Sequence, residues 1–112
     1  MSMILKIIAE DVQNKAVLRL SGRIDTPNAP ILEKKMHALI ESGQKVVLLD
    51  MTGVDYLSSA GLRIFLSATK ELKTRGGHFG LFNVQEDVME IIKMAGFNKI
   101  IKLFDDEKQA LQ

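Results

Sequence analysis

Two adjacent serines, Ser58 and Ser59, carry the hydroxyls best placed for chemistry in this chain. The apolar run of residues 45–49 before them predicts a central strand that is buried on both faces. A turn-rich loop follows over residues 50–58, and apolar residues then recur at the spacing of a helix. The serines are therefore expected where a strand has ended and a helix begins. That position offers free backbone N–H groups and the positive end of a helix dipole.

A serine at such a junction has two interpretations. Most often its hydroxyl caps the helix, because serine is among the best capping residues. The alternative is a reactive or modified hydroxyl. A hydrolytic nucleophile is disfavoured because no G-x-S-x-G turn surrounds Ser59. In addition, His37 is expected within a helix and His78 at the amino end of a strand, both badly placed for a base. We therefore predict no catalytic residue and a protein that is not an enzyme.

Three aspartates near expected strand ends raise a second possibility. Asp25 follows the second predicted strand and Asp50 ends the third, so both are expected to approach the serine loop, in which Asp55 lies. A phospho-accepting aspartate of the receiver type needs an acidic pair to hold Mg²⁺, but Asp25 is alone at its position. Turn and helix capping are favoured for Asp50 and Asp55. The two histidines have no cysteine or carboxylate at ligand spacing, so we predict no metal site and no cofactor.

Strands and helices alternate along the predicted chain. Strands are expected over residues 3–9, 16–20, 45–50, 78–82 and 99–103. Helices are expected from the capping stretch 25–27 to Gly43, over 59–74, from Asn83 to Gly96, and from the acidic residues 105–107 to Leu111. A short loop makes the first two strands antiparallel, whereas helical crossovers make the others parallel. The predicted fold class is α/β: one domain over residues 1–112, with a mixed sheet, a parallel centre and about four helices.

Length, composition and charge limit the number of domains, the kinds of binding partner and the cellular location that we expect. A length of 112 residues with 46% hydrophobic residues suits one compact domain. The formal net charge of +1 gives no basic footprint for nucleic acid and no reason to expect a membrane surface as partner. The chain has no cysteine, no apolar run of about 20 residues and no signal-peptide pattern. We expect a cytoplasmic protein.

Three stretches resemble the STAS domain of bacterial anti-sigma factor antagonists, also called anti-anti-sigma factors. They are residues 20–25 (LSGRID), 47–62 (VLLDMTGVDYLSSAGL) and 94–97 (MAGF). The likeness covers essentially the whole chain in order, and the central stretch is the specific one. The fold of that family agrees with the order of strands and helices predicted above.

The resemblance implies a partner-switching protein. In this family the unphosphorylated antagonist binds an anti-sigma factor that is also a serine kinase, which frees the sigma factor. Phosphorylation by that kinase ends the interaction, and a serine phosphatase restores it; ATP and Mg²⁺ belong to the kinase. On this sequence the acceptor falls on Ser59. Ser58 is the alternative, because it stands where the best-known family motif has aspartate.

The same resemblance implies a partner-binding surface around the serine loop. We assign to it Asp25, Thr26, Ser58, Ala60, Gly61 and Arg63. Asp25 could orient the partner or cap the first helix. The alternative function is a STAS-type scaffold or adaptor that binds a partner without phosphorylation.

Overall fold

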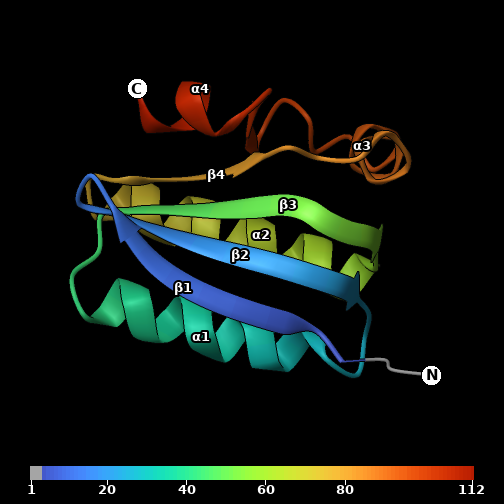
Figure 1. Ribbon diagram of the computed structural model, residues 1–112, viewed down its shortest axis with the longest axis horizontal. Coiled ribbons are helices and arrows are strands. Elements are labelled where there is room, and N and C mark those ends of the chain that lie inside the picture. Colours follow the sequence, from blue (N-terminus) through green and yellow to red (C-terminus); the bar gives the residue numbers. More distant parts are fainter. Residues whose placement is uncertain (1–3) are drawn as a thin grey trace.

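Five strands form one mixed sheet in the computed structural model, which describes residues 4–112 (Figure 1). The strand order across the sheet is β1-β2-β3-β4-β5; β1 and β2 are antiparallel, and all other neighbours are parallel. The strands are β1 (Lys6–Val12), β2 (Lys15–Ile24), β3 (Val46–Leu57), β4 (His78–Phe82) and β5 (Lys102–Phe104). The helices are α1 (Ala29–Glu41), α2 (Ser59–Thr74), α3 (Glu86–Met94) and α4 (Glu107–Leu111). The predicted α/β class, element order and mixed sheet are confirmed.

The central strands are buried on both faces because helices cover both sides of the sheet (Figure 1). On one face, Leu18 and Leu49 belong to the large core that also holds the buried side chains of α1 and α2. On the other face, Val17 and Leu48 pack in a smaller cluster with Ala110 of α4. Successive residues of a strand point to opposite faces, so unbroken apolar runs are what such strands require. This confirms the predicted central strand, which begins at Val46 rather than at Lys45.

Strand β3 is much longer than predicted. It does not end at Asp50 but continues to Leu57, so the predicted turn-rich loop over residues 50–58 is wrong. Beyond Asp50 the strand pairs with β2 alone, and its buried residues Met51, Val54 and Leu57 extend the core. Strand β2 is longer for the same reason, and continues to Ile24 rather than ending at residues 21–22.

Two glycines misled the prediction of these strand ends. Gly22 and Gly53 lie within β2 and β3, next to the points where the pairing of the two strands shifts register. A Cβ on Gly53 would lie 2.9 Å from the carbonyl oxygen of Leu20, and one on Gly22 would lie 2.7 Å from that of Ile4. Glycine at these points permits the close approach of two backbones in an irregular sheet, rather than marking a turn.

Several predicted boundaries are shifted. Helix α1 begins at Ala29 rather than at residues 25–27, because residues 25–28 form a separate turn. Asn83 has a left-handed φ of 55° and does not cap α3, which begins at Glu86 after Gln85. The first strand is Lys6–Val12 rather than 3–9, where residue 3 lies outside the described residues, and the last strand begins only at Lys102.

The remaining predicted ends are confirmed. Helix α2 and strand β4 have the predicted bounds, residues 59–74 and 78–82. Gly96 follows α3 with a φ of 80°, and the N–H groups of Gly96 and Phe97 donate to the carbonyls of Lys93 and Ile92. These two bonds form the Schellman ending that the sequence predicts. No helix within residues 4–112 is long and apolar enough to span a bilayer.

Candidate functional site

The junction between β3 and α2 presents its two serines differently. Ser58 is the N-cap of α2: its Oγ accepts a hydrogen bond from the N–H of Gly61 at 3.2 Å. Its own N–H donates to the carbonyl of Ile24 at 2.8 Å, and only 6% of the residue is exposed. Ser58 is therefore occupied in ending the strand and starting the helix.

Ser59 is the first residue of α2 and is exposed. Within the described part of the chain, its hydroxyl has no hydrogen-bond partner. The first hydrogen bond of the helix runs from the N–H of Leu62 to the carbonyl of Ser58, so the N–H groups of Ser59 and Ala60 point out of the helix end without a helical acceptor. A negative group on Ser59 would therefore lie at the positive end of the helix dipole.

The turn before α1 lies beside the serine loop, as predicted for Asp25. The N–H of Asp25 donates to Asn28 Oδ1 at 2.9 Å, and the N–H of Asn28 donates to Asp25 Oδ1 at 3.0 Å. The preceding residue, Ile24, accepts the bond from Ser58 that links the two segments. Asp25 therefore stabilises its own turn, and its buried partner is Asn28, which no sequence pattern indicated.

Three of the predicted partner-binding residues share one surface hollow. Thr26, Ala60 and Arg63 line a shallow groove of about 430 Å³ between the amino ends of α1 and α2. Gly61 is buried and lies outside its lining. A Cβ on Gly61 would lie 2.6 Å from Leu57 Cδ1 and 2.7 Å from Ile24 Cγ2, so this glycine lets α2 pack against the strand ends.

An aromatic and cationic pair next to the serines was missed in the sequence. Arg23 and Tyr56 are paired neighbours on β2 and β3, one residue before Ile24 and Leu57. The Arg23 guanidinium lies 4.2 Å from the centre of the Tyr56 ring, a cation–π contact, and both residues are exposed. Only the pairing of the two extended strands brings them together, so a prediction that treated residues 50–58 as a loop had no signal for it.

Asp50 does not lie at the serine loop, and that prediction is wrong. It is a half-buried residue within β3; its Oδ2 accepts from Arg19 at 3.1 Å and its Oδ1 accepts from the hydroxyl of Thr52 at 2.6 Å. Burial raises the pKa of the Asp50 carboxyl, but the bonds from Thr52 and Arg19 outweigh burial and hold that pKa below its ordinary value. Asp50 is a structural anchor in the middle of the sheet.

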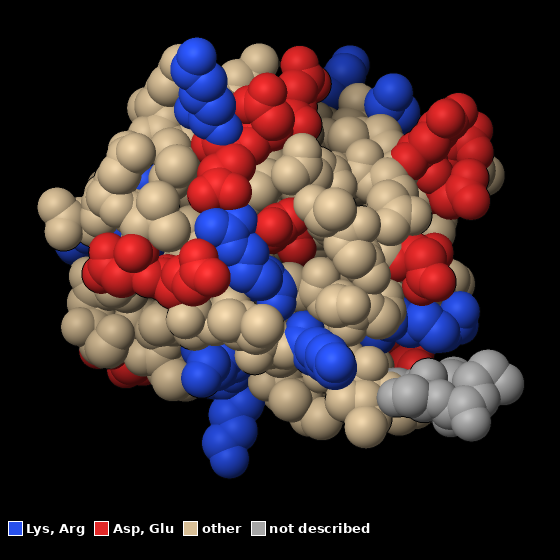
Figure 2. Space-filling view, in the orientation of Figure 1, with Lys and Arg blue, Asp and Glu red and all other residues tan. Residues whose placement is uncertain are grey.

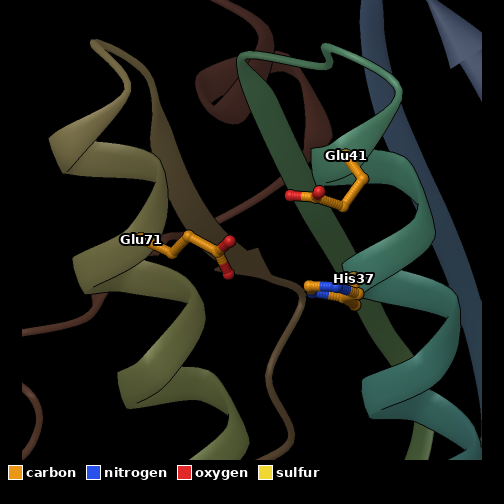
Figure 3. A group of neighbouring side chains, drawn as sticks. All are labelled: His37, Glu41 and Glu71. Carbon is orange, nitrogen blue, oxygen red and sulfur yellow. The ribbon is translucent and has the colours of Figure 1, made fainter.

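A histidine and two glutamates meet between α1 and α2 (Figure 3). His37 and Glu41 are four residues apart on α1 and face Glu71 of α2; one ligand atom from each lies within 4.8 Å of the others. The expectation that neither histidine has a carboxylate at ligand spacing is therefore wrong. Arg75, however, donates to both glutamates. The Arg75 guanidinium forms ion pairs with both carboxylates and so balances their charge. The cluster therefore connects α1 and α2 through ion pairs.

Neither histidine lies at the accessible hydroxyl of Ser59 in the part of the chain that the structure describes. His37 lies with Glu71, twelve residues beyond Ser59 along α2, and His78 begins β4 at the opposite end of the sheet. The junction therefore presents one exposed hydroxyl, that of Ser59, beside a shallow groove.

Comparison with known proteins shows which family this chain resembles. A protein-family model described as the STAS domain matches residues 6–110. The chain is 30% identical over 91 residues to an anti-sigma-B factor antagonist of Bacillus subtilis, a match that covers 81% of this chain and 83% of that protein.

Solved structures give the same fold. An anti-sigma factor antagonist from Mycobacterium paratuberculosis superposes with a TM-score of 0.89 at 26% identity, covering 99% of this chain and 94% of the other. The Bacillus cell fate determinant SpoIIAA, solved in its phosphorylated form, superposes with a TM-score of 0.70 at 17% identity, covering 94% and 95%. At that identity the second likeness concerns the fold alone.

Proposed function

Because this chain belongs to the STAS domain family, we propose that it is an anti-sigma factor antagonist. It is a regulatory binding protein rather than an enzyme, and it acts by binding an anti-sigma factor so that the sigma factor is released. We place this exchange in the cytoplasm. The STAS family assignment supports an anti-sigma factor as the partner. The groove beside Ser59 supports a function that depends on binding at the surface.

Phosphorylation of Ser59 is the proposed off-switch. The single observation that carries it is the contrast between the exposed hydroxyl of Ser59 and the buried, hydrogen-bonded hydroxyl of Ser58. A kinase needs an accessible acceptor, and only Ser59 provides one at this junction. The proposed enzymes are the anti-sigma factor itself, acting as a serine kinase with ATP and Mg²⁺, and a serine phosphatase that resets the antagonist.

Physical chemistry explains how a phosphate would switch the partner without unfolding the protein. A phosphate adds a charge of about −1.5 to −2 at neutral pH. At the start of α2 this charge faces free N–H groups and the positive end of the dipole, so the antagonist tolerates it. A partner packed against the same groove would lose contact through repulsion and the cost of desolvating the phosphate.

The partner surface that we propose surrounds this switch. Thr26, Ala60 and Arg63 line the groove and offer direct contacts. The hydrogen bond between Ser58 and Gly61 and the close packing of Gly61 fix the conformation of the loop. Asp25 stabilises the neighbouring turn. The exposed Arg23–Tyr56 pair extends this surface across the ends of β2 and β3.

The test is phosphate incorporation from the cognate anti-sigma factor kinase and ATP, measured by intact mass. Wild type is expected to gain one phosphate, and Ser59→Ala none while still binding the kinase. Ser58→Asp is the matched control, because aspartate also caps helices and restores the usual family residue; it should accept phosphate normally. Ser59→Asp should fold and bind the kinase weakly.

Two results would change the assignment. Labelling of Ser59→Ala together with none of Ser58→Asp would move the acceptor to Ser58. If no protein in the series, wild type included, takes phosphate from any serine kinase of the same organism, the switch fails. The scaffold or adaptor function, which binds without phosphorylation, would then replace it.

A further inference from the structure

A second pocket lies at the end of the sheet opposite to the serine loop. It has a volume of about 400 Å³ and is bounded by the last turns of α2, the start of β4 and the segment that leads into β5. In Figure 1 the carboxyl end of α2 and the start of β4 lie together, away from the β3–α2 junction. Five basic residues line it: Lys70 and Lys73 of α2, His78 of β4, and Lys99 and Lys102 around β5.

The positive charge of this pocket is not balanced by the protein. No aspartate or glutamate belongs to its lining. Across residues 4–112, none of its four lysines takes part in an ion pair, whereas Arg19 and Arg75 are both paired with carboxylates. On the face drawn in Figure 2, acidic and basic side chains are intermixed. A concave site of a single sign concentrates ions of the opposite sign.

The pKa of His78, which lines the pocket, is lowered in part by nearby positive charge. Burial, the largest cause, lowers the pKa of His78, and the positive charges of Lys102 and Lys15 lower it further. The cations that act on this imidazole are Lys102 from β5 and Lys15 from β2. Both are cations, so a bound anion beside Lys102 would bring negative charge toward His78.

The backbone fixes the position of the pocket. Strands β4 and β5 pair between Gly80 and Lys102, which sets the β5 lysine beside the β4 wall. The N–H of His78 donates to the carbonyl of Lys45 at 2.9 Å, and the N–H of Gly77 donates to that of Leu72 at 2.8 Å. The lysines therefore converge from two segments, α2 and residues 99–102, which the sheet and the end of α2 hold in place beside His78 of β4.

We propose that this pocket binds a small anion that carries two or more phosphoryl groups. Ammonium groups bind phosphate oxygens through charge-assisted hydrogen bonds, and lysine serves as a point charge for them. A volume of about 400 Å³ lies within the range of small-molecule sites and exceeds the size of a single phosphate. Lysines on separate segments suit separate phosphoryl groups of one ligand.

The pocket is independent of the proposed switch. Helix α2 has 16 residues, so its two ends are about 24 Å apart at 1.5 Å per residue. Ser59 lies at one end and Lys73 at the other. Binding of the anion is therefore expected to be the same in wild type and Ser59→Ala, and the two proposals can fail separately.

Calorimetric titration with tripolyphosphate at physiological ionic strength tests the proposal. We expect saturable binding of one tripolyphosphate per chain, and weaker binding of pyrophosphate and then of orthophosphate. Lys73→Ala/Lys102→Ala should weaken tripolyphosphate binding by about tenfold or more. Lys73→Arg/Lys102→Arg should retain most of it because the charge stays. The control is Lys34→Ala/Lys35→Ala, which removes the same charge from the exposed face of α1 and should change affinity less than about twofold.

Further measurements identify the ligand and its place. In NMR titrations the imidazole of His78 should show a raised pKa when tripolyphosphate binds. ATP is compared with tripolyphosphate: equal affinity assigns binding to the phosphoryl chain, and tighter binding of ATP extends the ligand to a nucleotide. The proposal is overturned if both alanine pairs weaken binding equally, if wild type shows no saturable binding at millimolar tripolyphosphate, or if a polyglutamate peptide binds more tightly than tripolyphosphate.

Discussion

Ser58 and Ser59 are adjacent, yet the Ser58 hydroxyl is buried and hydrogen-bonded whereas Ser59 is exposed to solvent. The Ser58 hydroxyl lies inside the junction, bonded to the N–H of Gly61, and the Ser59 side chain points outward from the first turn of α2. A helix begins with N–H groups that need acceptors, and one serine supplies the acceptor. The other is thereby left accessible for modification.

This difference predicts unequal effects on stability. Ser58→Ala removes the cap and should lower the free energy of unfolding by about 1 kcal/mol. Ser59→Ala should change the free energy of unfolding by less than about 0.5 kcal/mol, because the hydroxyl that it removes is exposed and has no hydrogen-bond partner among the described residues. Urea unfolding of both variants measures these values. Ser58→Asp, which restores an acceptor, should recover most of the loss; a larger loss in Ser59→Ala than in Ser58→Ala would contradict the assignment.

At the scale of elements, Arg19 of β2 joins four segments through three carboxylates. Its guanidinium donates to Glu10 of β1, to Asp50 of β3 and to Glu107 of α4, the last at 2.6 Å. The hydrogen bond with Glu107 is the largest cause that raises the pKa of Arg19 above its ordinary value, against the opposing effect of burial. Helix α4 is short, and this network together with Ala110 fixes it on the sheet.

The network predicts acid sensitivity. The pKa of Asp50 is lower in the folded protein than its ordinary value of 3.8, so its contribution is complete above that value and is lost as the pH falls through the folded pKa. Asp50→Asn should therefore be less stable than wild type at pH 7, and the difference should shrink at acidic pH. Chemical unfolding at several pH values measures it.

A double-mutant cycle provides the control for this prediction. In an Arg19→Met background the effect of Asp50→Asn should be smaller, because a main partner is already absent. A difference between wild type and Asp50→Asn that stays constant as the pH falls would show that the carboxylate charge is not the cause.

At the scale of the whole molecule, the sheet carries the two proposed sites at opposite ends. The carboxyl ends of β2 and β3 hold the serine loop, and the start of β4 holds the lysine pocket. Both depend on β3, the strand that pairs with β2 and β4. Its middle is buried between the two helical layers, so the position of both sites depends on the core.

Leu48 tests that dependence. It is fully buried between Val17, Phe82 and α4. Leu48→Ala should lower the free energy of unfolding by about 2–5 kcal/mol, because it removes apolar contacts and leaves a cavity. Ile8→Ala on the exposed side of β1 is the control and should cost much less, since 59% of Ile8 is exposed. Thermal or urea unfolding compares the two; equal losses would argue against a central position for β3.

The sequence alone determined the local features of this protein. Apolar runs and helical spacing specify the order of the elements, and the glycine after α3 specifies its ending, because such signals act between residues close in the chain. The motif around Ser59 likewise lies in one contiguous stretch. The tertiary structure decided what depends on distant partners. Pairing with β2 extends β3 to Leu57, so Asp50 lies within the strand and away from the serine loop. The same pairing brings the Arg23 guanidinium over the Tyr56 ring. The burial of one serine and the convergence of lysines from α2 and residues 99–102 also arise only when strands and helices pack, since no local pattern encodes contacts between remote residues.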